Sequence, residues 1–183
     1  MAHLLRISRY IDETNKKMGD FAGWLILAMA IVTFIVVILR YFFNLGWVWI
    51  QDSVSYMHGA SFMLAAAYTL LNNEHVRVDI LYQPLSEAKK AKVNIIGTSL
   101  LLFPFCFLIW FYGFEYVANS WAVFEGSKET GGLGGVYIVK SLVIIFPTLL
   151  FLQGVSEIIK AVEIIKKSGD LQTQTTKQVG PDV

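Results

Sequence analysis

Four long stretches of the chain carry no charged residue: residues 21–39, 53–73, 93–114 and 141–156. About 20 helical residues are needed to cross the roughly 30 Å hydrocarbon core of a bilayer. The fourth stretch reaches that length if it includes residues 136–139 and Lys140 extends its ammonium group to the lipid headgroups. The pattern predicts an all-α membrane protein with four transmembrane helices, at about 21–43, 53–73, 93–116 and 134–157.

The two ends of the chain differ from this transmembrane domain, which spans residues 21–167. In residues 1–20, apolar side chains recur at helical spacing between charged ones, which predicts an amphipathic helix lying on the membrane face. A solvated extension of the first span is the alternative, and a signal peptide is disfavoured because the apolar stretch is too long and no cleavage site follows. Residues 168–183 are polar, with Gly169 placed to end a helix, so we expect a disordered tail.

Composition agrees with a membrane location. The chain is 55% hydrophobic and only 16% charged, with a mean hydropathy of +0.55. A net charge of +1 gives no reason to expect nucleic acid as a partner. The single cysteine, Cys106, can form no intrachain disulfide and no cysteine metal cluster.

The basic residues are unevenly placed around the four predicted spans. Of the 15 Lys and Arg residues, only Arg40, Lys128 and Lys140 lie on the side of the first and third loops. Because positively charged loops stay in the cytoplasm, this bias predicts a multi-pass protein with both termini and the 74–92 loop in the cytoplasm.

Chemistry within the spans is sparse. His58 is the one histidine inside the four uncharged stretches, and we interpret it as a satisfied side chain in helix packing. The alternative is a haem ligand, as in a membrane anchor of a redox complex, but His3 and His75 lie outside the spans and supply no second axial ligand. No nucleophile with a base at matching depth is evident, so we do not expect an enzyme.

The second predicted span is rich in small residues. They follow the small-x-x-x-small spacing that lets helices approach closely in a bilayer, at Ser55 and Gly59 and again at Ser61 and Ala65. This span should therefore be the one most covered by protein. Pro104 and Pro147 should kink the third and fourth spans.

Polar residues gather at the edges of the predicted spans. Arg40, Asn44, Trp47 and Asp52 mark the outer ends of the first two spans, and Glu74, His75, Arg77 and Asp79 mark the inner end of the second. They are either ordinary solvated loop residues or, at the inner end, a structured cytoplasmic elbow held by an Arg and carboxylate pair.

These edge residues resemble the small membrane subunit, DctQ-like, of tripartite ATP-independent periplasmic (TRAP) transporters. The resemblance covers about residues 21–165 and rests on the order of several short motifs, namely Arg40-Tyr41-Phe42-Phe43-Asn44 with Trp47 and Asp52, Ala65 to Leu70, His75-Val76-Arg77-Val78-Asp79, Gly131-Gly132-Leu133, Lys140-Ser141 and Leu152-Gln153-Gly154. Two positions depart from the common pattern, because many relatives have glutamate in place of Asp52 and proline in place of Gly46. These departures weaken a fixed role for Asp52.

The resemblance implies one part of a three-part importer in the bacterial inner membrane. A large membrane subunit would carry the substrate and sodium sites, and a soluble periplasmic protein would deliver the substrate, mostly an organic acid anion. The small subunit would then bind no cofactor of its own. Arg40, Asn44, Trp47 and Asp52 would lie where the periplasmic protein docks, and Ser55, Gly59, Ser61 and Ala65 would pack against the large subunit. A homo-oligomeric channel or carrier that acts alone remains the other alternative.

Overall fold

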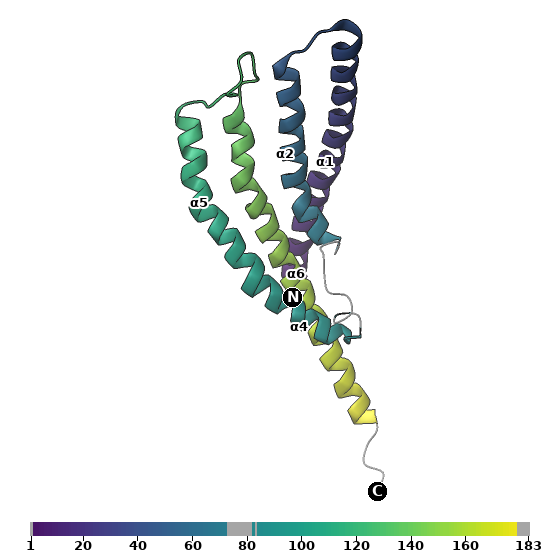
Figure 1. Cartoon of the computed structure of the whole chain (residues 1–183). Coiled ribbons are helices and arrows are strands. Elements are labelled where there is room, and N and C mark those ends of the chain that lie inside the picture. The colour runs from purple at the N-terminus through teal and green to yellow at the C-terminus, as the bar shows by residue number, and fades with distance from the viewer. Residues whose placement is uncertain (1, 73–81, 83, 179–183) are drawn as a thin grey trace.

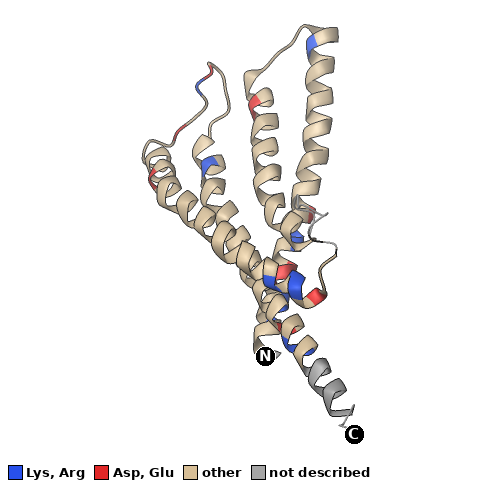
Figure 2. Cartoon of the chain, turned by 60° about the horizontal axis from the view of Figure 1, so that its bottom comes forward, with Lys and Arg blue, Asp and Glu red and all other residues tan. Residues whose placement is uncertain are grey.

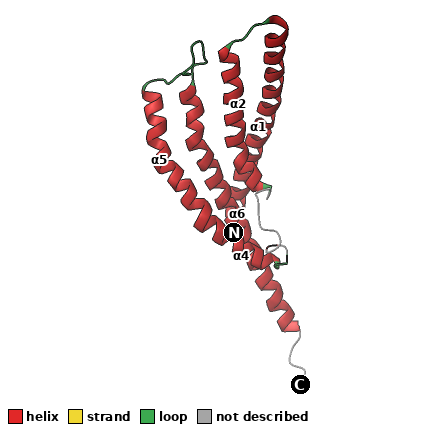
Figure 3. Cartoon of the chain, in the orientation of Figure 1, coloured by secondary structure: helices red, strands yellow, loops and turns green. Residues whose placement is uncertain are grey.

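A computed structural model describes the backbone of residues 2–72, 82 and 84–178, and the side chains of residues 3–72, 82 and 84–169. The described chain is helical and contains no strand (Figure 3). Its elements are α1 (Ala2–Phe43), α2 (Val48–Leu71), α4 (Glu87–Gly97), the π-helical turn η1 (Thr98–Leu102), α5 (Phe103–Ala122) and α6 (Val136–Gln178). Because α4, η1 and α5 follow one another without a break, they form one long helical segment.

The long helices form an open fan, in the order α5, α6, α2 and α1 (Figure 1). α6 contacts α1, α2, α4 and α5, whereas α5 packs mainly on α6 and η1 among the described elements. The residues at 44–47 and 123–135 join helices at one end of the fan, here called the loop end. The opposite end holds the start of α1, the end of α6 and α4, and is called the termini end.

Three of these helices are long and apolar enough to cross a membrane: the segments His3–Phe43, Glu87–Ala122 and Val136–Gly169. α2, with 24 residues, is long enough but less apolar, because polar and small residues interrupt its hydrophobic ones. Among the described residues, Lys and Arg are concentrated at the termini end, and the middle of each helix is almost free of charge (Figure 2).

In the predicted amphipathic segment 1–20, the described residues 2–20 do not form a separate helix. α1 runs without interruption from Ala2 to Phe43. This segment is therefore an extension of the first predicted span, which was the alternative. The polar residues Ser8 and Asn15 are buried against α6. The predicted helix is confirmed for the described residues, and its inward face packs on α6.

The expected stop at Gly169 is also wrong. α6 continues through Gly169 to Gln178, past the boundary at 168. Glycine lowers helix stability by about 1 kcal/mol without preventing a helix, and no proline follows before residue 181.

The two prolines lie within continuous helical segments. Pro104 is the second residue after η1, and Phe103, between them, donates its N–H to the carbonyl of Thr98. This wider turn makes room for a ring that would otherwise meet the carbonyl of Leu100. Pro147 is buried inside α6, which continues on both sides of it.

Candidate functional site

Asp52 anchors the long loop at the loop end. Its Oδ2 accepts a hydrogen bond from the backbone N–H of Leu133 at 2.9 Å. One turn further along α2, the hydroxyl of Tyr56 donates to the carbonyl of Leu133 at 2.8 Å. Both backbone groups of Leu133 are therefore satisfied by α2, and we call this arrangement the Leu133 clamp. It gives Asp52 a structural role within the chain.

The glycines before Leu133 are required by this close approach. A Cβ atom on Gly132 would lie 2.7 Å from Asp52 Oδ2 and would also overlap Ser127. Gly131 has φ of 75°, in the left-handed region that side chains rarely adopt. The Gly131-Gly132-Leu133 sequence thus supplies a turn, a gap and an anchored residue.

An ion pair closes the base of the same loop. Lys140 of α6 pairs with Glu125, and its Nζ lies 4.1 Å from the centroid of the Tyr116 ring on α5. The hydrogen bond from Lys140 holds the pKa of Glu125 below its ordinary value. Lys140 was expected to reach toward lipid headgroups, but the structure gives it a partner within the protein.

The other predicted residues at the loop end lie near one another in sequence without joining the Leu133 clamp. Arg40 is exposed on the last turn of α1, and Trp47, 44% exposed, precedes the first residue of α2. Asn44 has φ of 54°, a conformation that Asn tolerates, and Leu45 then bonds back to the carbonyl of Leu39. Asn44 thus turns the chain between two helices.

The four predicted elbow residues, Glu74, His75, Arg77 and Asp79, lie outside the described residues.

The small residues of α2 do not share one face. Ser61 is buried and donates to the carbonyl of His58, while Ser55 is exposed. Gly59 faces Val139 of α6, because a Cβ atom at position 59 would lie 3.9 Å from Val139 Cγ1. Ala65 is half-buried. Part of this set therefore packs inside the chain. His58 is exposed on the surface of the single chain.

An open groove of about 540 Å³ lies where α1 and α2 meet toward the termini end. Tyr68 of α2 packs over Gly19 so closely that a Cβ atom there would overlap its ring. The groove is lined by Gly19, Asp20, Gly23, Trp24, Leu27 and Tyr68.

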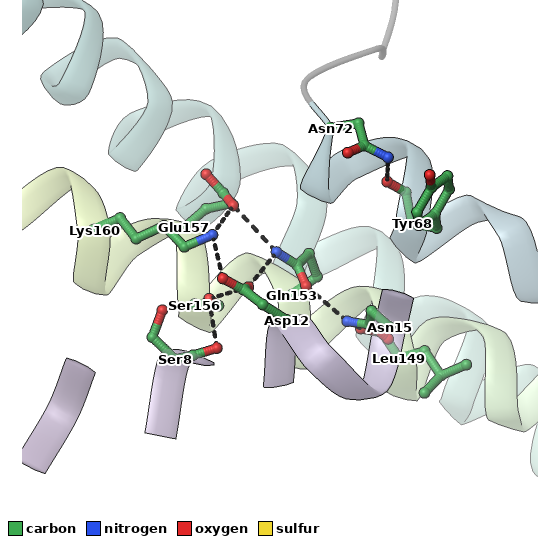
Figure 4. A network of polar contacts seen from close by, with 10 residues as sticks. All are labelled: Ser8, Asp12, Asn15, Tyr68, Asn72, Leu149, Gln153, Ser156, Glu157 and Lys160. Atoms are coloured by element: carbon green, nitrogen blue, oxygen red, sulfur yellow. Dashed lines mark hydrogen bonds and ion pairs between the residues drawn. The ribbon is translucent and has the colours of Figure 1, made fainter. Parts of the chain in front are cut away.

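A polar network that the sequence did not reveal joins α1 to α6 near the termini end (Figure 4). Gln153, fully buried, is its centre: Nε2 donates to Asp12 Oδ1 at 3.0 Å and to Glu157 Oε1 at 3.1 Å. Lys160 forms ion pairs with both carboxylates, at 2.8 Å to Asp12 and 2.9 Å to Glu157. The polar groups of two helices that are distant in sequence therefore satisfy one another.

Two serines extend the same network. The Oγ of Ser156 donates to Asp12 Oδ1 at 2.7 Å, so it accepts the hydrogen of Ser8 Oγ, also 2.7 Å away. The helical spacing of Ser8, Asp12 and Asn15, and of Gln153, Ser156 and Lys160, is the signal that could have indicated two facing polar stripes.

Residues 29–163 match the family model described as tripartite ATP-independent periplasmic transporters, DctQ component. No curated protein and no solved structure matches the chain. The matched region begins within α1 and ends within α6, so it includes α2, the Leu133 clamp and the α6 half of the polar network.

Proposed function

The chain belongs to the DctQ family of components of tripartite ATP-independent periplasmic transporters, and we propose that it is the small membrane subunit that holds the large membrane subunit in place. In this proposal the large subunit carries the substrate and sodium sites. A periplasmic protein delivers the substrate, an organic acid anion, at the loop end.

The open fan is the observation that carries the scaffold role. The buried apolar residues among those described are few and mostly small, including four alanines and Cys106. Large apolar side chains of α1 and α5 point outward, such as Phe34, 65% exposed, and Phe111, 79% exposed. Such surfaces need lipid or another membrane protein to cover them.

We propose that α2 is the fourth crossing and that both termini are cytoplasmic. At 1.5 Å per residue α2 is about 36 Å long, enough for a bilayer core. The concentration of Lys and Arg at the termini end supports this orientation. Replacing Cys106 by serine and placing single cysteines at Ser86 and Lys128 tests it, since only the residue 128 variant should react with an impermeant thiol reagent outside intact cells.

Docking of the periplasmic protein would use the loop end. The Leu133 clamp and the Glu125 ion pair stabilise the loop, which presents exposed Lys128 and Glu129. Arg40 and Trp47 are exposed at the same end of the fan. Glu74, His75, Arg77 and Asp79 would form a structured elbow on the cytoplasmic side.

Purification of the tagged chain from its native membranes tests the scaffold function. A large polytopic protein should be recovered with it in a fixed ratio, and recovery of the chain alone would contradict the proposal. An absorption spectrum of the same preparation tests the haem alternative, because a Soret band would identify a redox anchor.

A further inference from the structure

Apart from Trp49 in its first turn, the exposed residues of α2 form a single stripe. Between Ile50 and Leu71 the exposed positions are Gln51, Ser55, His58 and Phe62, and every other residue of this stretch is at least half-buried. Their spacing of four, three and four residues places them on one side of the helix. The rest of α2 packs against α1 and α6.

This stripe differs in chemistry from the exposed surfaces of the neighbouring helices. On α1 the exposed residues between 21 and 37 are apolar apart from Thr33, whose hydroxyl bonds to its own helix at Met29. On η1 and α5 the side chains most exposed between residues 100 and 111 are Leu and Phe. These surfaces suit lipid tails, whereas three of the four residues in the α2 stripe are polar.

Two polar groups in the stripe have no hydrogen-bond partner among the residues that the structure describes. Ser55 Oγ bonds to the carbonyl of Gln51 at 3.4 Å, but the described residues offer no hydrogen bond to the Gln51 amide or the His58 ring. His58 lies ten residues into α2, about 15 Å from its start, which is near the middle of a bilayer that α2 crosses. An unpaired ring at that depth loses its hydrogen bonds to water without compensation.

We infer that the stripe formed by Gln51, Ser55, His58 and Phe62 is the surface that contacts a transmembrane helix of the large subunit. This inference rests on the proposed function. Lipid tails cannot supply a hydrogen-bond partner, whereas a helix with a hydroxyl, amide or carboxylate side chain facing His58 can. Ser55 is small enough to let that helix approach closely, and Phe62 supplies an apolar contact. The low hydropathy of α2 is then explained by the polar residues on the side that faces the large subunit.

Photocross-linking locates the contact. A benzoylphenylalanine at position 55 or 58 should give a product with the combined mass of this chain and the large subunit. Matched probes at Phe34 of α1 and Phe111 of α5 should give no cross-linked product with the large subunit. Products from positions 34 or 111 alone, with the large subunit still recovered, would overturn the assignment and leave the proposed function standing. A product of twice the chain mass from position 58 would assign the stripe to a second copy. Recovery of the wild-type chain without a large partner would overturn both proposals.

Substitution of His58 tests the hydrogen bond. His58→Leu should insert into membranes as well as the wild type but bind the large subunit roughly three- to fifteen-fold more weakly, the range for one hydrogen bond between helices in a bilayer. His58→Gln keeps a donor and an acceptor and should restore part of the binding. If the large subunit were recovered with His58→Leu as well as with the wild type, the proposed hydrogen bond of His58 would be contradicted.

Discussion

The side-chain amide of Asn15 donates to Gln153 Oε1 at 2.7 Å, between two residues that are 138 positions apart. Both are almost completely buried, Asn15 at 1% exposure and Gln153 at 0%. The carboxylates of Asp12 and Glu157 fix the orientation of the Gln153 amide, because its NH₂ group must point at them. Its oxygen is thereby turned toward Asn15, and the first turns of α1 are held on α6.

Gln153→Leu should lower the free energy of unfolding by about 2–3 kcal/mol, because it leaves buried donors and acceptors on α1 without a partner. Gln153→Glu should cost more, since it places a third carboxylate beside Asp12 and Glu157. Thermal unfolding in detergent measures both changes. Leu152→Ala, at a neighbouring exposed position, is the control. A Gln153→Leu protein as stable as the wild type would show that the network contributes little.

The sequence predicts the helices of this protein well because apolar stretches and their length determine them locally. It does not predict the polar network, since Ser8, Asp12 and Asn15 follow the same periodicity whether they face water or α6. Which face is buried depends on a helix more than 130 residues away.

The Leu133 clamp was hidden for a different reason. Asp52 bonds to a backbone N–H, and any residue at position 133 except proline could supply that group. The resemblance of Gly131-Gly132-Leu133 to a family motif therefore pointed to this segment, but only the structure shows that it is held by α2.

Gly132→Ala should loosen the loop at the loop end. The added methyl group would lie 2.7 Å from Asp52 Oδ2, so the hydrogen bond from Leu133 must lengthen or break. A loss of about 1–2 kcal/mol makes the open loop roughly five- to thirty-fold more populated. Cleavage by trypsin after Lys128 measures that population. Gly134→Ala has nothing within 4 Å and should be cleaved at the wild-type rate; equal rates for the two variants would contradict the clamp.

The Glu125 ion pair should make the stability of the loop depend on pH. Its hydrogen bond from Lys140 lowers the pKa of Glu125 below 4.5, its ordinary value. The stabilisation is therefore complete above about pH 4.5 and is lost as the pH falls through the lower pKa of the folded protein. Hydrogen exchange of the 123–135 amides should be slower in the wild type than in Glu125→Gln at pH 7. The protection difference should shrink toward pH 3 after correction for intrinsic exchange, and a difference independent of pH would rule out the carboxylate as its source.

Gly154→Ala should separate α6 from the π-helical turn. A Cβ atom at position 154 would lie 2.7 Å from Leu102 Cδ2 and 2.9 Å from Phe103 Cε1. The Phe103 ring has little freedom to move away, because it packs against Phe151 with 4.5 Å between ring centroids. Overpacking of this kind costs about 1–3 kcal/mol, which thermal unfolding in detergent would detect as a lower Tm. Gly97→Ala meets no atom within 4 Å in its helix and should raise stability slightly. A gain in stability for both variants would show that the contact between η1 and α6 does not require glycine at position 154.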